Sequence, residues 1–383
     1  MSTIARGRLN TRSPVRQRGV ALLAALILML ALVVILGNIF YRHQIDVSQA
    51  TTSLHGDQAF LLALSGENWA RELLTDANDD RAVDSFDDDW AQAMPVLPVD
   101  GGLLTGCISD LQGRVNLNSF GGYSSQSLKA EMDSDKAGIG KTWLQLLTQL
   151  ELRAEPVRVA SIVDWIDADS EIVNSWGAEQ PDYDGLSPPR VVANGVITDS
   201  TELAAIMGYE VAEVQRLLPW LSALPTSTPI NVNTADERLL LAMGGELGSD
   251  FSRLVMEQRP FKTLDQLHSA IAQNEGLEMA VIKSRWPASF VAVNSSYFEL
   301  YLEVTLGEAR IEVKSIMDRQ DRTEPVIIAR QVTLVPASLP QPESSAVEDL
   351  FKESPDDDFD EDGNQIAETD QVQSACLMIG ETN

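Results

Sequence analysis

Residues 20–40 read VALLAALILMLALVVILGNIF, a run without a single charged side chain, and this run decides the fold. At about 1.5 Å per helical residue it extends roughly 30 Å, which matches the hydrocarbon core of a bilayer. Five arginines precede the run: Arg6, Arg8, Arg12, Arg16 and Arg18. Since positive charge stays on the cytoplasmic side, the sequence predicts one membrane-crossing helix with everything after Phe40 outside.

The helical pattern continues beyond the far face of the membrane. Apolar side chains recur at helical spacing as far as Leu73, with charged residues between them. The apolar positions include Val47, Leu54, Leu61, Leu62, Trp69 and Leu73. We therefore predict one long helix, half in the membrane and half packed on a domain.

The basic leader meets the apolar run at Gly19-Val20. A secretory signal peptide has a shorter apolar core followed by a small-x-small cleavage site, which is missing after Phe40, whereas a simple anchor fits the hydropathy. A charged leader, a glycine and an uninterrupted apolar helix together resemble a type IV prepilin signal. The resemblance implies cleavage after Gly19 and an N-methylated Val20. Prepilins usually carry Glu at the fifth mature position, where this chain has Ala24, and a subunit without that Glu suits the end of a filament.

The composition limits the classes of partner and chemistry. The chain has 383 residues and a formal net charge of -29, which repels nucleic acid and suits divalent cations, basic partners or solubility. Cys107 and Cys376 are too few for a disulfide framework, although an oxidising compartment would allow them to pair. With only three histidines, a histidine-based zinc site or a catalytic triad is disfavoured.

Three kinds of segment follow the first helix. A β-hairpin is predicted at 103–118, with Asp110-Leu111-Gln112-Gly113 as its turn. Strands are predicted again at 297–305, 309–316 and 325–334. Helices are predicted between them, at 143–150, 157–166, 200–207, 211–220, 235–243, 250–258 and 263–273. The simplest fold pairs the hairpin with the late strands against the first helix and inserts the helical block between the two halves of the sheet.

Carboxylates are densest between residues 164 and 185. Asp167 and Asp169 leave the end of a predicted helix, and Glu179, Asp182 and Asp184 return from a loop rich in Gly and Pro. Such a loop is destabilised by mutual repulsion unless something neutralises it, and Ca²⁺ accepts many oxygen ligands in flexible geometry. Calcium binding is therefore favoured over a solvated acidic loop, and a glycosidase-type pair of carboxylates is the enzymatic alternative.

Three other motifs favour structural interpretations. The acidic segment 76–89 is interpreted as a solvated loop. Residues 358–364 match the first half of an EF-hand loop, but loop position 12 is Thr369, so the spacing fails. Residues 229–267 resemble a helix-hairpin-helix, but the acidic hairpin at 244–250 disfavours phosphate contact, so packing or protein contact is preferred.

Together these motifs resemble the K-type minor pseudopilin of the bacterial type II secretion system over residues 16–335. The resemblance is carried by the Gly19-Val20 boundary with Ala24 and by the runs at 110–118, 164–169, 177–179, 201–203, 229–235 and 294–298. It implies an α+β pilin-like fold, a long N-terminal helix packed on an antiparallel sheet, with a large α-helical domain inserted between strands. It also implies calcium in the acidic loop and a complex with I-type and J-type minor pseudopilins at the tip of the pseudopilus. The chain departs from the family at Gln180-Pro181, which leaves individual ligands open, and in the acidic tail.

The expected domains are a leader at 1–19, a membrane helix at 20–41, the pilin-like core at 42–124 and 291–336, the inserted helical domain at 125–290 and a disordered acidic tail at 337–383. The function expected is that of a non-enzymatic assembly protein, anchored in the inner membrane with its bulk in the periplasm, that supports export of folded proteins across the outer membrane. Its expected partners also include the major pseudopilin and prepilin peptidase, but no nucleic acid. The alternatives are a minor pilin of type IV pili and a membrane-anchored periplasmic hydrolase using Asp167 or Glu179.

Overall fold

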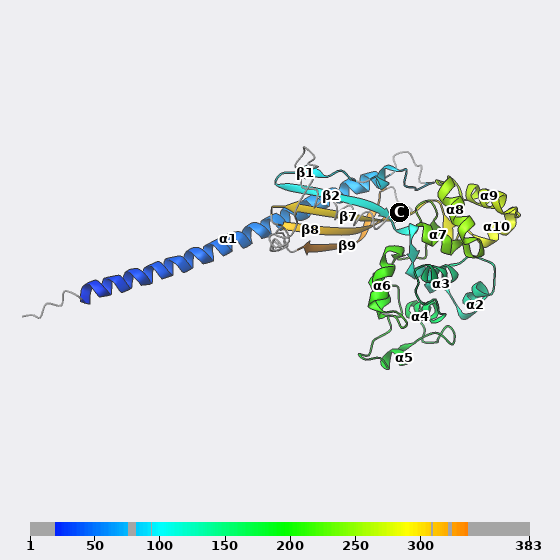
Figure 1. Cartoon of the computed structure of the whole chain (residues 1–383), viewed down its shortest axis with the longest axis horizontal. Helices are drawn as coiled ribbons and strands as arrows, with labels where there is room; N and C mark the ends of the chain where they lie inside the picture. Colours follow the sequence, from blue (N-terminus) through cyan, green and yellow to red (C-terminus); the bar gives the residue numbers. More distant parts are fainter. Residues whose placement is uncertain (1–19, 76–81, 93, 308, 321–323, 336–383) are drawn as a thin grey trace, which may run out of the picture. The chain divides into compact units, whose positions relative to one another are not determined.

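The computed structural model describes residues 20–75, 82–92, 94–307, 309–320 and 324–335. The expected leader, the EF-hand-like run at 358–364 and the rest of the expected acidic tail lie outside these residues. Helix α1 spans Val20–Leu74, which confirms the prediction of one long helix (Figure 1).

The chain forms two compact units, Met1–His55 and Gly56–Asn383. In the described part of the first unit, the apolar side chains of α1 from Leu22 to Phe40 are exposed. By length and composition α1 is the one helix of the described residues that can cross a membrane, with a mean hydropathy of 2.9 in its most apolar window.

The second unit contains a five-stranded antiparallel sheet in the order β1-β2-β7-β8-β9 (Figure 1). The strands are β1 (Leu97–Val99), β2 (Gly102–Asp110), β7 (Tyr297–Leu306), β8 (Ala309–Asp318) and β9 (Val326–Val335). The three late strands therefore form as predicted, and β7 joins them to β2 in the register Cys107 with Tyr301.

Small residues allow α1 to lie close to the sheet. Ala59, Ala63 and Ala70 are fully buried in one cluster with apolar side chains of β2, β7 and β8. A Cβ added to Gly66 would stand 2.9 Å from Leu302, so only glycine fits there without a shift. Buried Glu67 accepts one hydrogen bond from the Ser315 hydroxyl on β8 and two from the Arg330 guanidinium on β9, which fixes α1 over these strands.

The predicted hairpin at 103–118 is wrong. Strand β2 pairs with β1 and β7, whereas β3 (Val115–Asn116) runs parallel to β4 (Leu221–Ser222) in a separate two-stranded sheet. The intervening 3-10 turn at 111–113 is held by distant residues, since the Gln112 side chain donates to the Pro229 carbonyl and accepts from the Ser296 amide. These long-range bonds carry the chain out of the sheet, which a local turn pattern does not reveal.

The helical block lies between β3 and β6 in the sequence. Its helices are α2 (Ser125–Met132), α3 (Ile139–Gln149), α4 (Val157–Ile166), α5 (Gln180–Asp184), α6 (Val211–Leu217), α7 (Glu237–Gly244), α8 (Gly248–Gln258), α9 (Leu264–Glu275) and α10 (Met279–Arg285). A second small parallel pair joins β5 (Ile230–Asn231) to β6 (Val291–Ala292). Helices α3, α4 and α6 to α9 fall where the sequence predicted helix, the segment at 200–205 is 3-10 rather than α-helical, and α2, α5 and α10 were not predicted.

Large buried aromatic side chains form the centre of the block. Trp143 and Trp286 are fully buried in a single cluster that also takes in the β3 and β5 strands. Trp286 stacks on Phe251 at 5.1 Å between ring centroids, and Trp143 donates a hydrogen bond of 2.8 Å to Tyr209. The block therefore has its own core, separate from the cluster between α1 and the sheet.

A buried polar network joins the block to the sheet. The carboxylate of Asp110, at the end of β2, accepts hydrogen bonds from Ser295 at 2.5 Å, from Thr234 at 2.6 Å and from Asn231 at 3.0 Å. Burial raises the pKa of Asp110 because it disfavours the charged form. The network fixes the two crossings of the chain between sheet and helices.

Asp84 belongs to the same junction, although the sequence suggested a solvated loop at 76–89. It forms a buried ion pair with Arg319 and accepts a hydrogen bond of 2.7 Å from the Ser295 amide. Burial raises the pKa of Asp84 to about 6, with a contribution from the charge of Asp110 and partial compensation by Arg319. Asp87 and Asp89 are exposed as predicted, whereas residues 76–81 lie outside the described residues.

Candidate metal site in the acidic loop

The acidic loop begins where α4 ends. Asp167 is the C-cap of α4: its amide still donates to the Val163 carbonyl, but its backbone is extended. The chain therefore turns away from the helix at this residue. Two residues later the Asp169 carboxylate accepts a hydrogen bond of 2.8 Å from the Glu171 amide and turns the chain back. Local turn chemistry thus presents both aspartates on one side of the loop.

Asp164 fixes the rest of the loop. It is fully buried on α4, and its two carboxylate oxygens accept hydrogen bonds from the Val173 amide at 2.8 Å and the Ala178 amide at 2.7 Å. A Cβ added to Gly177 would stand 2.0 Å from the Asp164 carboxylate, so the glycine is required for this approach. Asp164 therefore anchors the second half of the loop and places Glu179 opposite the two aspartates.

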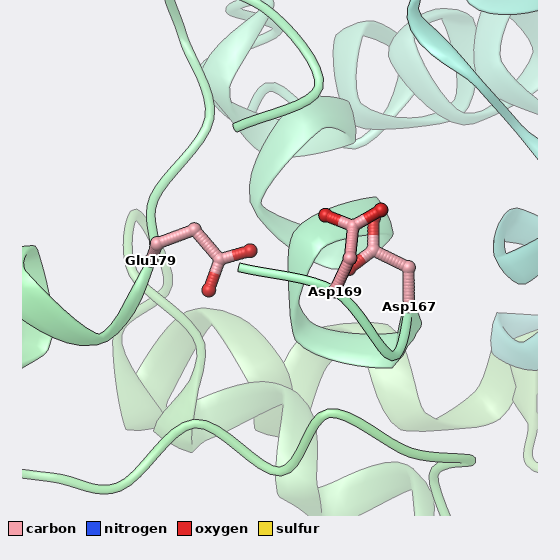
Figure 2. A group of neighbouring side chains, drawn as sticks. All are labelled: Asp167, Asp169 and Glu179. Carbon is pink, nitrogen blue, oxygen red and sulfur yellow. The ribbon is translucent and has the colours of Figure 1, made fainter. Parts of the chain in front are cut away.

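Three of the five predicted ligands come together. Carboxylate oxygens of Asp167, Asp169 and Glu179 lie within 4.8 Å of one another. Figure 2 shows the Glu179 side chain extending from its own segment toward the two aspartates. One carboxylate oxygen of Asp167 and both oxygens of Glu179 are buried without a hydrogen-bond partner.

These orphaned oxygens carry an electrostatic cost. The pKa of Asp167 rises to about 6 because burial disfavours its charged form and Asp169 repels it. The pKa of Glu179 is also raised, first by burial and then by the charge of Asp167. The described ion pairs do not include any of the three carboxylates.

Convergent, unpaired carboxylate oxygens fit a hard divalent cation. Calcium takes six to eight oxygen ligands, and this group offers up to six carboxylate oxygens next to loop carbonyls and solvent. A cation would satisfy the orphaned oxygens and offset both the burial and the repulsion that raise the two pKa values. The three carboxylates therefore offer the donor set of a candidate cation site.

Asp182 and Asp184 are not part of the group. The Asp182 carboxylate accepts a hydrogen bond of 3.1 Å from the Glu179 amide at the start of α5. The Asp184 carboxylate accepts one of 2.6 Å from the Gln180 side chain, and both aspartates are exposed. The geometry thus gives these two residues local roles in α5.

The sequence analysis did not identify two residues that hold the acidic loop in place, Asp164 and Asn194. Asp164 was visible in the run 164–169, but nothing in the spacing separates an anchor from a ligand. Asn194 lies in left-handed backbone conformation, at φ 42°, and donates a hydrogen bond of 3.0 Å to the Asp169 carbonyl. An isolated Asn far along the chain gives no sequence signal for such a contact.

Comparison with known proteins places the acidic loop in a recognised family segment. Residues 113–226 match the family model described as type II secretion system (T2SS), protein K. The matched segment includes Asp164 and the three convergent carboxylates.

Relatives extend the match over most of the chain. Type II secretion system protein K of Aeromonas hydrophila is 31% identical over 82% of this chain and 97% of its own length. The protein K of Pseudomonas aeruginosa is 30% identical over 82% of this chain and 93% of its own length.

A solved structure has a similar fold. It is the crystal structure of the GspK-GspI-GspJ complex from the type 2 secretion system of enterotoxigenic Escherichia coli. The similar chain has a TM-score of 0.63 and 22% sequence identity, over 74% of this chain and 99% of that chain. This likeness supports the pilin-like fold with an inserted helical domain.

Proposed function

The chain belongs to the type II secretion system protein K family, and from this premise we propose that it is a minor pseudopilin at the tip of the pseudopilus. The observation that carries the proposal is the 31% identity that spans 97% of a protein K relative. The fold adds support, because a long helix with an exposed apolar first half continues into a helix packed on a sheet.

The tip position rests on Ala24 and on the helical block. In a filament body, a Glu at this position of α1 would pair with the N-terminus of the next subunit, and an unpaired carboxylate in lipid would be costly. Ala24 has no charge that needs a partner, so this subunit does not require another subunit ahead of it. The bulky helical block between β3 and β6 would then block further subunits from adding above.

Processing and anchoring precede assembly in this proposal. Prepilin peptidase cuts after Gly19 on the cytoplasmic face, Val20 becomes the methylated N-terminus, and α1 holds the subunit in the inner membrane with its second unit in the periplasm. The subunit then joins the I-type and J-type minor pseudopilins above the major pseudopilin. The filament supports export of folded proteins across the outer membrane, and the protein contributes assembly rather than catalysis.

Calcium is the cation that we propose for Asp167, Asp169 and Glu179. When bound, it would supply charge neutralisation and hold the two sides of the acidic loop together. The protein residues do the remaining work, since Asp164 fixes the loop backbone and Asn194 holds the Asp169 carbonyl. The cation is structural in this proposal.

The experiment that tests the pilin class is the intact mass of the full chain after co-expression with prepilin peptidase. We expect a mass that begins at Val20 with one added methyl group, and a Gly19→Leu variant that keeps the leader serves as the control. An N-terminus that stays at Met1 or Ser2 in the unaltered chain would contradict the proposal. A processed chain that assembles only with type IV pilus subunits would favour the pilus alternative instead.

A further inference from the structure

Two stretches of the helical block beside the candidate metal site expose large apolar side chains. The exposed fractions are 50% for Ile172, 55% for Trp176, 80% for Val191 and 56% for Val196, and we call these four residues the apolar patch. None of the four belongs to the hydrophobic clusters that the described residues form. Single exposed apolar residues are ordinary, but a group that includes a tryptophan has the composition of the centre of a protein interface.

Hydrogen bonds hold the two stretches side by side. The Gln180 side chain donates to the Arg190 carbonyl at 3.0 Å and accepts from the Val192 amide at 3.1 Å. The Asn194 side chain donates to the Asp169 carbonyl at 3.0 Å. The apolar patch is therefore carried by backbone that is already fixed, so little conformational entropy remains to be lost when a partner binds.

The apolar patch lies at one end of the helical block. A Cβ added to Gly177 would stand 3.1 Å from the Cβ of Ile172, so Ile172 lies close to the backbone that follows Trp176. Helix α5 separates the two stretches in the sequence, and Figure 1 shows it at the end of the block away from α8 to α10. A surface at this end is open to a partner from outside the block.

The charge around the apolar patch decides what can bind there. Residues 167–202 contain eight acidic side chains and one basic side chain, Arg190, whose guanidinium donates to the carbonyls of Ala204 and Ala205. One divalent cation would leave this segment strongly negative. A second copy of the chain or an anionic lipid surface would therefore be repelled, and the complementary partner is a protein surface with Lys or Arg around apolar side chains.

We propose that the apolar patch is the docking surface for a protein segment that combines apolar side chains with lysine or arginine. The apolar side chains form the buried centre of the contact, and the acidic side chains around them form its polar rim and exclude acidic partners. The inference goes beyond the proposed function, since it concerns a partner other than the pseudopilins, and it does not depend on the cation.

The first test measures the binding of short labelled peptides by fluorescence anisotropy, with the full chain in phosphatidylcholine nanodiscs. A peptide of alternating arginine and leucine carries both required features, whereas arginine–serine and glutamate–leucine peptides carry one each. We expect the arginine–leucine peptide to bind at least about 10-fold more tightly than either of the others. Equal affinity for the arginine–leucine peptide and either of the other two would overturn the proposal, because one feature alone would then explain binding.

A pair of double variants locates the binding surface. Trp176→Ser with Val191→Ser should lower the affinity for the arginine–leucine peptide at least about 10-fold. Val211→Ser with Val281→Ser is the matched control, since these valines are 63% and 47% exposed on α6 and α10, and it should keep the affinity of the unaltered chain. A loss in both variants, or in neither, would overturn the proposal.

Two further measurements distinguish other occupants of the apolar patch. The Trp176→Ser, Val191→Ser variant should still co-purify with the I-type and J-type subunits, and loss of either subunit would place the patch inside that complex and overturn a separate docking surface. Phosphatidylglycerol vesicles should leave the hydroxyl-radical oxidation of Trp176 unchanged, and protection of Trp176 would assign the patch to a membrane instead. Both failures leave the proposed function intact, because that function is tested on the processing and partners of the unaltered chain.

Discussion

The substitution Asp167→Asn tests whether the acidic loop binds a cation or is only solvated. In the structure the Asp167 carboxylate faces Asp169 and Glu179, and one of its oxygens is buried without a partner. Because its charged form is disfavoured there, with a pKa raised to about 6, the neutral amide should raise the melting temperature in EDTA. The same substitution removes a calcium ligand, so it should also abolish the gain in melting temperature that calcium gives.

The magnitude follows from mass action. Extracellular calcium modules often have dissociation constants near 10⁻⁴ M, so about 10 mM Ca²⁺ is a hundredfold excess and adds about 2.7 kcal/mol to the free energy of unfolding. A unit of this size gains about 2 °C for each kcal/mol, so we expect the unaltered chain to melt about 5 °C higher in Ca²⁺ than in EDTA. Asp167→Asn should show a shift of less than about 1 °C by the same estimate.

The assay is differential scanning fluorimetry of the full chain in detergent at pH 7, with EDTA, with Ca²⁺ and with Mg²⁺. Asp184→Asn is the matched control, because that exposed carboxylate accepts its hydrogen bond from Gln180 and lies outside the group. It should keep the full calcium shift. The reasoning is refuted if Ca²⁺ and EDTA give the unaltered chain the same melting temperature, or if Asp184→Asn loses the shift as completely as Asp167→Asn.

Three further predictions concern the residues that hold the fold. Asp164→Ala leaves the buried amides of Val173 and Ala178 without an acceptor, so urea denaturation should show a loss of about 3 kcal/mol; an unchanged midpoint would show that Asp164 does not anchor the loop. Glu67→Ala leaves Arg330 unpaired and should lower the free energy of unfolding by about 3 kcal/mol in the same assay. This value is at the lower end for a buried pair because the Arg330 side chain is 35% exposed. A loss below about 0.5 kcal/mol would contradict the role given to the pair. The folded-state pKa of Asp84 is raised to about 6, so its protonation contributes stability that is fully present below its unfolded pKa near 4 and is lost as pH rises through about 6. In EDTA, the melting temperature of the unaltered chain relative to Asp84→Asn should therefore fall between pH 4.5 and 7, and a difference that rises with pH would reverse the assigned sign.

Periodicity predicted those elements whose stability is local. The second half of the long helix and the strands β7 and β8 bury apolar side chains in one cluster, and their apolar patterns show in the sequence. The helices α3, α4 and α8 are predicted for the same reason. Strand β9 is rich in β-forming residues, although its side chains are mostly exposed. In contrast, α5 has 5 residues and opens with Gln180-Pro181, so it offers too little sequence for a period to show.

Long-range hydrogen bonds account for the failures. The segment Asp110–Gly113 has the composition of a hairpin turn, but Asp110 bonds Asn231, Thr234 and Ser295, which lie more than a hundred residues away. The acidic segment before Trp90 has the composition of a solvated loop, but Asp84 is buried against Arg319. Neither partner is visible from the local sequence.

The candidate site was predicted by residue type and only partly by geometry. Clustering of carboxylates indicated a cation site, and three of the five predicted ligands converge. Spacing did not distinguish Asp182 and Asp184, which lie outside the group, from Glu179, because both accept local hydrogen bonds in and next to α5 that the spacing does not reveal. Asp164 shows the same limit, since its two bonds to the loop backbone define its role.

The central claim is that this chain is the K-type subunit of a minor pseudopilin complex, and the most direct measurement is co-purification. The full chain is co-expressed with prepilin peptidase and with tagged I-type and J-type minor pseudopilins of the same secretion system, solubilised in detergent and passed over the tag resin and then a sizing column. We predict that the processed chain elutes with both partners in one complex of equal stoichiometry. A chain that is processed and folded but elutes alone, while the I-type and J-type subunits still bind each other, would contradict the claim.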